Sequence, residues 1–320
     1  MITYRRFRNT DPPALADVWN ESLTGRGSYP LPTPSQFERW VFSKPYFDHD
    51  GLILAVDDAA NRVVGFALAG FGPTEDLSAL DKTQGVVCVV VVRPGERRKG
   101  IGRELVRRAE AYLTAGGATT LRVGPAWPNC PFGFGLYGGT DAPGFLASDA
   151  GADPFVKALG YAPAEQTLVY QKRLDQPLTI ADARFGVLRR RYDTQVHRAA
   201  EEPSWWHDCV WGTLEPVEFR LMDKLTNLPA AEVTVWELEG YGWRWGFPAA
   251  GVLDIHVRED LRRQGLAKML MSSVLRFVQD QFFGIVEVHA RADRPDAVAL
   301  CKSVGLDQVD VGTTYVKQQS

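Results

Sequence analysis

Apolar residues follow two spacings along this chain. Consecutive apolar runs, typical of buried strands, include Val86 to Val92. After this run, Ile101, Leu105, Ala109 and Tyr112 lie at intervals of four, four and three residues, the stripe of an amphipathic helix. These patterns predict strands at 2–8, 51–56, 62–70, 86–92, 119–124 and 165–173, and helices at 12–23, 34–42, 100–115 and 153–159.

The central pattern occurs twice. Residues 92–102 align without a gap with residues 257–267, at an offset of 165 residues, and the helical stripe keeps that offset. Gly160 and Gly305 each follow a short helix-like stretch, as C-terminal caps do. We therefore expect two domains descended from one. The predicted domains are residues 1–175 and 178–320.

The first half carries about twenty residues that the second half lacks. They lie at 124–150 and are rich in glycine, proline and aromatic residues. Long loops within compact domains often carry function. We predict a structured, lid-like loop here, with Tyr137 as a candidate site residue; the alternative is that Tyr137 anchors the loop by packing.

The repeated segment has the features of a pyrophosphate site. It joins a strand to a helix, whose first backbone amides have no partner within the helix and lie at the positive end of its dipole. Glycine removes the Cβ that would keep a phosphate away, and basic residues add positive charge. The predicted contacts are Arg97, Arg98, Lys99, Gly100, Ile101 and Gly102 in the first copy, and Arg262, Arg263, Gln264, Gly265, Leu266 and Ala267 in the second.

Composition excludes several classes of protein. The 36 basic and 39 acidic side chains give a net charge of −3, which argues against a sequence-independent nucleic-acid binder. The longest apolar run, at seven residues, is too short for a bilayer, which takes about twenty. The N-terminus carries no secretory signature, and the four cysteines are far apart, so we expect a cytoplasmic protein without a disulfide scaffold or a metal site.

The duplicated segment resembles the acetyl-CoA signature of the GNAT N-acetyltransferase superfamily, Arg-x-x-Gly-x-Gly/Ala after a strand. Both copies match it in full, at 97–102 and at 262–267. The second GNAT signature matches in part at Ala297, Leu300 and Gly305. Two such units in a chain of this length resemble the tandem, mycothiol synthase type of GNAT protein.

The resemblance implies an α+β fold with α/β/α layers. Each of two tandem GNAT domains would hold a mixed, mostly antiparallel sheet flanked by helices, with two central parallel strands that splay apart. It also implies acetyl-CoA as the acyl donor and no metal. The pantetheine arm would bind the main chain of Val90, Val91 and Val92, or of Ile255, His256 and Val257. An amine, on a small molecule or a peptide, would attack the thioester directly.

The acid–base residues of the GNAT pattern are missing. The family often has a glutamate or histidine eleven residues before the motif arginine, where this chain has Val86 and Gly251. Cys301 replaces the tyrosine that usually protonates the thiolate. His256 is our candidate base, oriented by Asp254 two residues earlier on the same strand face; alternatively, other groups satisfy both.

Other interpretations stay open at this stage. A non-catalytic acyl-CoA-binding or sensing protein would explain the missing acid–base pair, and one half could be purely structural. Trp205, Trp206 and Trp211 are interpreted as packing residues, and the alternation in 242–246 as a hairpin strand beside the second cleft. We expect no nucleic-acid or membrane partner, and a monomer or homodimer.

Overall fold

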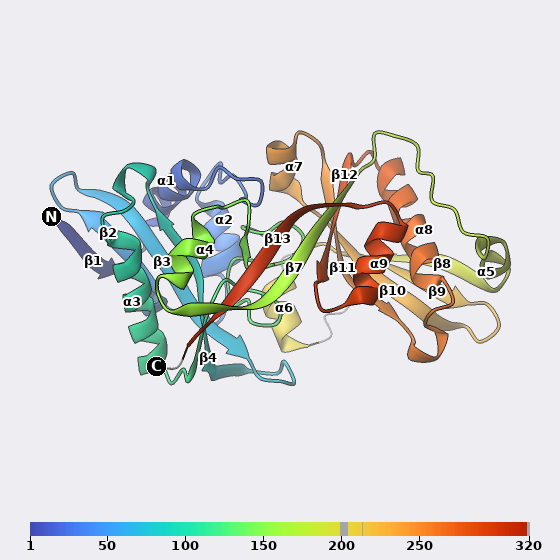
Figure 1. The fold of residues 1–320 in the computed structure, drawn as a ribbon, viewed down its shortest axis with the longest axis horizontal. Coiled ribbons are helices and arrows are strands. Elements are labelled where there is room, and N and C mark those ends of the chain that lie inside the picture. The colour runs from blue at the N-terminus through green and yellow to red at the C-terminus, as the bar shows by residue number, and fades with distance from the viewer. Residues whose placement is uncertain (199–203, 213, 319–320) are drawn as a thin grey trace. The chain divides into compact units, whose positions relative to one another are not determined.

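The computed structural model describes residues 1–198, 204–212 and 214–318, which form two compact units, each a sheet with helices. Unit 1 comprises Met1–Gln166, helix α6 (Trp205–Trp211) and the end of the chain from Val311 (Figure 1). Unit 2 comprises the chain from Thr167 through strand β8 (Tyr192–Arg198), together with Leu214–Asp310.

The sheet of unit 1 has the strand order β1-β2-β3-β4-β5-β13-β7. Strands β4 and β5 are parallel, whereas β1 to β4 pair antiparallel in sequence, and β5 and the short β6 each pair antiparallel with β13. The strands are β1 (Ile2–Arg6), β2 (Leu52–Asp57), β3 (Arg62–Pro73), β4 (Leu80–Val92), β5 (Thr120–Val123), β6 (Phe145–Leu146), β7 (Tyr161–Arg173) and β13 (Asp307–Lys317).

Helices cover both faces of this sheet. Helix α3 (Ile101–Ala115) buries the predicted stripe of Ile101, Leu105 and Ala109 against Val87 and Val123, with Leu113 in the same core. Alternation along β3 turns Phe66 to the opposite face, where it contacts Phe37 of α2 (Ser35–Phe37). Helix α1 and two shorter elements complete the unit: α1 (Pro12–Ser22), the π-turn Glu38–Phe42 and α4 (Ala152–Lys157).

Unit 2 repeats this plan in the order β8-β9-β10-β11-β12-β7. Strands β11 and β12 are parallel, and the other neighbours are antiparallel. The strands and helices are β9 (Val217–Asp223), β10 (Leu228–Glu237), β11 (Ala249–Val257), β12 (Ile285–Arg291), α5 (Phe185–Arg191), α7 (Glu239–Trp245), α8 (Leu266–Asp280) and α9 (Pro295–Ser303). The predicted α+β fold and its two tandem units are confirmed.

Each half of the sequence supplies its last strand to the sheet of the other half. The second part of β7 pairs with β12, for example Tyr170 with Val288, and the end of β13 pairs with β5, for example Tyr315 with Val123. The compact units therefore differ from the contiguous halves 1–175 and 178–320. Strand-forming residues show that a segment becomes a strand, but not which edge it joins.

Helix α6 comes from the second half of the sequence but packs in unit 1. Its Trp206 is fully buried and donates from Nε1 to the carbonyl oxygen of Pro128 at 2.8 Å. The ring of Trp211 stacks on Trp127, with centroids 4.9 Å apart. The packing role predicted for these tryptophans is confirmed, although Trp205 remains 38% exposed.

A buried lysine closes the C-terminal end of α6. Nζ of Lys44 donates to the carbonyl oxygens of Cys209, at 2.6 Å, and Val210, at 3.2 Å. The last carbonyls of a helix have no intrahelical donor, so the lysine satisfies them. Burial lowers the pKa of Lys44 to about 8.

The wild-type protein is expected to gain stability relative to Lys44→Met as pH rises from about 8 to 10.5. Over this interval the unfolded chain, with the ordinary lysine pKa of 10.5, binds more protons than the folded chain. The shift corresponds to roughly 3 kcal/mol across the interval. Urea unfolding of both proteins at the two ends measures the change, and a pH-independent difference would contradict it.

The prediction of a hairpin strand at 242–246 is wrong, because this segment belongs to helix α7. Tyr241 and Trp245 lie one helical turn apart with ring centroids separated by 5.2 Å. Gly246 ends the helix in the left-handed conformation, with φ +80°, and its amide bonds to the carbonyl of Gly242. The alternation of Trp243 and Trp245 suggested a strand, whereas Trp245 pairs with Tyr241 along a helix.

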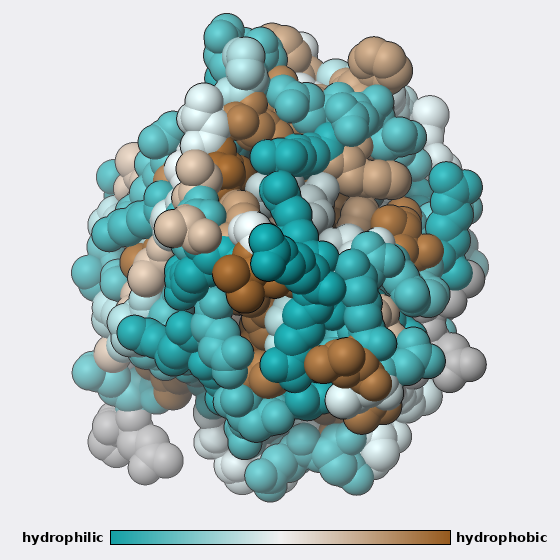
Figure 2. Space-filling view, turned by 90° about the vertical axis from the view of Figure 1, so that its right-hand side faces the viewer, coloured by the Kyte–Doolittle hydropathy of each residue, from teal (hydrophilic) through white to brown (hydrophobic). Residues whose placement is uncertain are grey.

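The face of the molecule that Figure 2 shows is mostly hydrophilic. Exposed apolar side chains occur singly in unit 2, such as Val187 in α5, Leu225 between β9 and β10, and Phe282 between α8 and β12. Single exposed apolar residues are normal on globular proteins. Among the helices that the structure describes, none is both long and apolar enough to cross a membrane.

Candidate functional site

The two parallel strands at the centre of each unit separate part-way along. In unit 1, β4 and β5 pair only from Gln84–Thr120 to Val87–Val123, after which β4 continues beside β3 alone. In unit 2, β11 and β12 pair only as far as Val252–Val288. These last pairs correspond at the 165-residue offset, and the predicted splay is present in both units. The stretches predicted to bind pantetheine, 90–92 and 255–257, lie beyond it.

The turns that follow these strands have nearly the same backbone in both units. Each begins with a 3-10 turn, Pro94–Glu96 or Glu259–Leu261, closed by a 2.9 Å hydrogen bond from its last amide to the preceding arginine carbonyl. Arg98 and Arg263 then adopt φ +64° and +65°, an uncommon left-handed conformation for a residue with a side chain. We call residues 97–102 and 262–267 the first and second cradles.

A glycine ends each turn and begins a helix of 15 residues. Gly100 and Gly265 have φ +84° and +93°. A Cβ on Gly100 would meet no atom within 4 Å, so this helix N-terminus is open to an anion. At Gly102 the glycine favours close packing rather than access for an anion. A Cβ there would lie 3.2 Å from the ring of Phe155, so glycine lets α4 pack closely.

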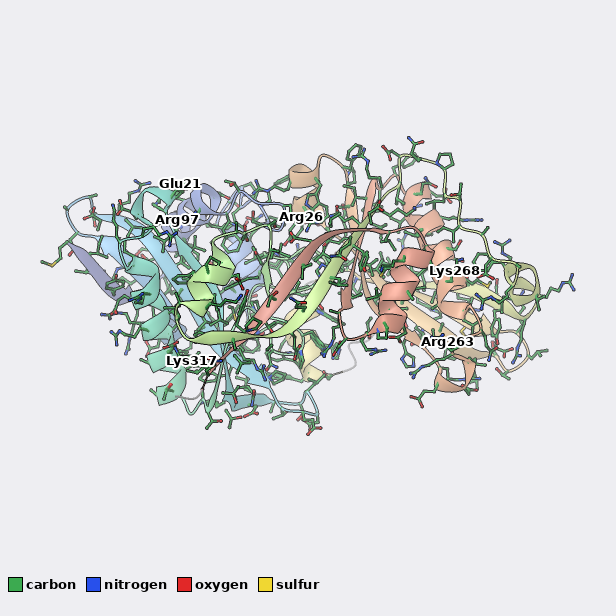
Figure 3. All side chains as sticks on the ribbon, in the orientation of Figure 1. Glu21, Arg26, Arg97, Arg263, Lys268 and Lys317 are labelled. Atoms are coloured by element: carbon green, nitrogen blue, oxygen red, sulfur yellow. The ribbon has the colours of Figure 1, made fainter. Side chains whose placement is uncertain are left out.

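The motif arginine holds the first cradle in place through backbone carbonyls. Arg97, labelled in Figure 3, donates from Nε to the carbonyl of Val92 at 3.0 Å. One of its terminal nitrogens donates to the carbonyl of Ser22, at the end of α1, at 2.9 Å. Arg262 makes the matching bond to Val257 at 3.2 Å. The arginine thus supplies positive charge and also fixes the turn to its strand.

The second cradle has an extra guanidinium beside it. A Cβ on Gly265 would lie 2.9 Å from Cζ of Arg184, which is held by Asp182 through two charge-assisted hydrogen bonds. The same interaction holds the pKa of Asp182 well below its ordinary value. Lys268, in the first turn of α8, donates to the carbonyl of Ala181. A Cβ on Gly100 has open space around it, so the first cradle is the more open of the two.

The candidate base His256 and its partner Asp254 are exposed at the end of β11. Asp254 occupies a bulge with φ +47°, which breaks the alternation that would have put the pair on one face. His256 lies opposite Glu232 of β10 instead. Their catalytic role stays a prediction, without support from hydrogen bonds between them.

Tyr137 is buried inside the 124–150 loop. Its hydroxyl donates to Asp149 and accepts the backbone amide of Leu146 at 3.0 Å. The loop is itself mostly buried from residue 130 to 140. This geometry favours the anchoring role that the sequence left open, and a catalytic role for Tyr137 stays a prediction.

The structure singles out two residues that the sequence analysis missed, Glu287 and His289 of β12. Glu287 lies directly opposite Gly251, the position where the GNAT pattern often has its base. It is fully buried, with Oε2 2.8 Å from Nε2 of Gln171 and Oε1 3.2 Å from Nε2 of His289. A buried carboxylate needs such partners. The sequence did contain a signal for this pair, because polar residues at alternate positions interrupt an otherwise apolar strand.

Unit 1 has different chemistry at the equivalent positions. Val86, buried and apolar, lies opposite Arg122 in the register where unit 2 has Gly251 and Glu287. An arginine stays protonated at neutral pH, so it cannot act as a base. The corresponding residue to His289, at the 165-residue offset, is Gly124.

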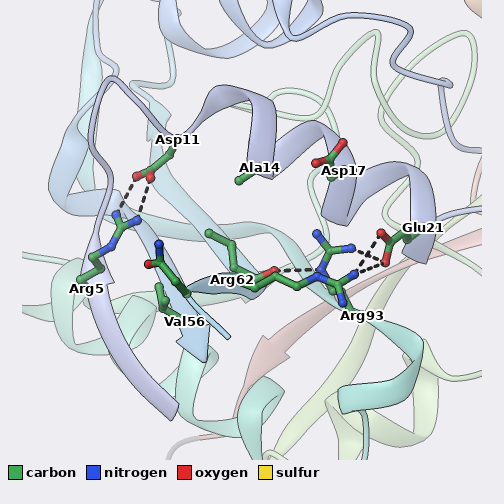
Figure 4. Close-up of a pocket in the computed structure, with 10 residues that line it drawn as sticks. Arg5, Asp11, Ala14, Asp17, Glu21, Val56, Arg62 and Arg93 are labelled. Carbon is green, nitrogen blue, oxygen red and sulfur yellow. Dashed lines mark hydrogen bonds and ion pairs between the residues drawn. The ribbon is translucent and has the colours of Figure 1, made fainter. Parts of the chain in front are cut away.

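A pocket of about 470 Å³ runs along α1 in unit 1 (Figure 4). Five of its six charged side chains form ion pairs: Arg5 binds Asp11 through two bonds of 2.7 Å, and Arg62 and Arg93 both bind Glu21. These ion pairs tie α1 to the sheet, so we assign the pocket a structural role.

Metal ligands are not gathered in the described part of the chain, where no group of three or more His, Cys, Asp or Glu side chains could hold an ion. The four cysteines are free and buried. Burial raises the pKa of Cys301 to about 11, so this thiol is protonated at neutral pH.

The comparison with known families agrees with the duplicated geometry. The profile of the acetyltransferase (GNAT) family matches residues 13–128 and 191–306. The chain belongs to the acetyltransferase (GNAT) family. Each match ends beyond one cradle and its helix, so the tandem GNAT architecture expected from the repeat is confirmed.

Solved GNAT structures share the fold over the whole chain. A tandem GNAT protein from the clavulanic acid biosynthesis pathway has a TM-score of 0.69 at 16% identity, with both chains fully covered. A GCN5-related N-acetyltransferase from Sphaerobacter thermophilus has a TM-score of 0.64 at 16% identity, covering 99% of this chain and 95% of its own. A glucosamine N-acetyltransferase region of a fungal multi-domain β-N-acetylglucosaminidase has a TM-score of 0.68 at 14% identity, covering 99% and 38%. No protein of curated function matches the chain significantly.

Proposed function

We propose that this protein is an acetyl-CoA-dependent N-acetyltransferase. The observation that carries the proposal is the pair of cradles with matching torsions, each at the end of a strand that has lost its neighbour on one side. The cradle offers amides to a pyrophosphate, and the unpaired strand edge offers main-chain groups to the pantetheine amides. One extended ligand with both parts fits this arrangement.

The proposed reaction is direct attack of an amine on the acetyl thioester. In this proposal the thioester lies near the last paired residues of the splayed strands, Val87 in unit 1 and Val252 in unit 2. Backbone amides at the unpaired edge would donate to the oxygen that becomes negative during attack. The buried cysteines are protonated thiols rather than nucleophiles, which favours transfer without a covalent acyl-enzyme.

Unit 1 supports a second role, acyl-CoA binding without catalysis. Its base position carries Val86 and its opposite residue is Arg122, so neither can accept a proton from the amine. The first cradle is nevertheless complete and open. We infer that unit 1 binds acetyl-CoA as a structural or sensing unit. The alternative of acyl-CoA binding without catalysis therefore still applies to unit 1.

Isothermal titration with acetyl-CoA, combined with thiol release, tests the proposed function. We expect heat of binding at tens of micromolar protein, and release of free CoA thiol with at least one amine from a panel of glucosamine, spermidine, glycinamide and benzylamine. Folded protein that gives no heat would remove the proposal. Binding without thiol release from any amine would leave only the acyl-CoA-binding role.

The acceptor in this proposal is a small-molecule or peptide amine, and the reaction takes place in the cytoplasm. A reducing compartment suits four free cysteines that lie far apart in the sequence. Size-exclusion chromatography with light scattering distinguishes the two expected states, a monomer and a homodimer.

A further inference from the structure

Two residues of β12 form a polar pair within an apolar strand. Val286, Val288 and Ala290 point into the core beneath α8 and α9. Alternation therefore turns Glu287 and His289 to the opposite face of the sheet. Their side chains are 0% and 7% exposed, and Nε2 of His289 lies 3.2 Å from Oε1 of Glu287.

The pair lies at the point where the central strands separate. The last paired residues of β11 and β12 are Val252 and Val288, so His289 is the first residue of β12 beyond the pairing. Glu287, one pair earlier, lies opposite Gly251, which places no side chain beside the carboxylate. Gln171 of β7 holds the other carboxylate oxygen at 2.8 Å.

The hydrogen bonds define what the imidazole can do. An ionised carboxylate can only accept, so with Glu287 ionised the neutral ring carries its proton on Nε2 and a lone pair on Nδ1. Nδ1 is buried and finds no hydrogen-bond partner among the described residues. An unpartnered nitrogen on a histidine that a carboxylate orients is the arrangement of a general base.

We propose that His289 is the general base of acetyl transfer in unit 2 and that Glu287 is its positioning residue. This inference rests on the proposed function and deepens it, because it assigns catalysis to unit 2 and to β12 rather than to the strand that the GNAT pattern uses. Unit 1 has Gly124 and Arg122 at the same two positions and lacks this device.

The proton balance of the proposed step is complete. The acceptor ammonium first releases one proton to solvent, and the neutral nitrogen then attacks the carbonyl carbon. Nδ1 of His289 takes the surplus proton from that nitrogen as the C–N bond forms. The C–S bond breaks with its electron pair on sulfur, and the thiolate receives the proton from the imidazolium, which leaves an amide and CoA thiol.

His289→Gln tests the catalytic role. The glutamine amide can still donate to Glu287 but cannot take a proton, so kcat for thiol release with the fastest amine of the panel is expected to fall at least about 100-fold. The affinity for acetyl-CoA in titration should stay within threefold. His197→Gln is the matched control, since its Nε2 is also buried without a described partner but lies on β8, at the far edge of this sheet.

Glu287 is tested by the order of two substitutions. Glu287→Asp keeps a carboxylate, whereas Glu287→Gln keeps the shape and loses the charge. If Glu287 positions the base, the aspartate variant retains the larger kcat, with KM for acetyl-CoA unchanged in both; a structural role predicts the reverse order. Thermal melts confirm that each variant is folded.

The outcomes separate the two proposals. Activity of His289→Gln within threefold of wild type would overturn the base assignment and leave the acetyltransferase proposal intact. Wild-type protein that binds acetyl-CoA and releases no thiol with the panel would overturn both.

Discussion

Gly100→Glu is expected to abolish acetyl-CoA binding at the first cradle, with at least a 100-fold loss of affinity in titration. The new carboxylate would stand at the helix N-terminus, where a Cβ has open space around it, and would repel the phosphates across a short distance. The left-handed φ of +84° costs about 1 kcal/mol for any side chain.

Gly100→Lys is the matched control, because it carries the same backbone cost and the opposite charge. It should retain affinity within several-fold. Gly265→Glu is expected to have a smaller effect on the second cradle, since Arg184 lies within reach of the new carboxylate and would pair with it. Equal, small effects of the glutamate and lysine variants at position 100 would show that the phosphates bind elsewhere.

Gly144→Ala is expected to displace the last strand of the chain from unit 1, at a cost of roughly 3 kcal/mol or more. A Cβ on Gly144 would lie 2.4 Å from the backbone carbon and oxygen of Thr313, where no flexible side chain can move aside. Thr313 pairs with Phe145 and thereby positions β13 beside β5. Loss of this contact exposes the edge of β5.

Gly160→Ala separates the clash from the backbone strain. Gly160 has φ +83°, almost the same as the +84° of Gly144, and a Cβ there would meet no atom within 4 Å. This control should cost about 1 kcal/mol. Urea unfolding measures both variants, and hydrogen exchange at Tyr315 and Val316 reports directly on β13. Equal costs for the two alanines would refute the close approach at Gly144.

The sequence predicted the structure of the two cradles because their features are local. The strand, the turn, the left-handed glycine and the amphipathic helix occupy a short stretch, and each is encoded by the residues within it. Because the same features recur at an offset of 165 residues, the sequence also predicted the tandem GNAT architecture. The caps at Gly160 and Gly305 followed from the same local chemistry, with φ +83° and +74°.

The candidate acid–base residues were harder to predict. His256 and Asp254 were chosen because two residues separate them on one strand, but a bulge at Asp254 changes the faces that they present. Glu287 became a candidate because it lies opposite Gly251, which is 36 residues earlier in the chain. That pairing depends on the register of two parallel strands, and a sequence pattern does not contain the register.

By itself, the sequence determined the secondary structure of the cradles and the presence of two related units, and it predicted that the cradles bind an anion. Only the tertiary structure decided that β7 pairs with β12 and β13 with β5, and that α6 packs in unit 1. It also decided that Glu287 and His289 meet where β11 and β12 separate. The physical reason is the distance along the chain over which the interactions act. Backbone torsions and helix caps depend on neighbours within a few residues, whereas strand partners are chosen by the packing of the whole unit.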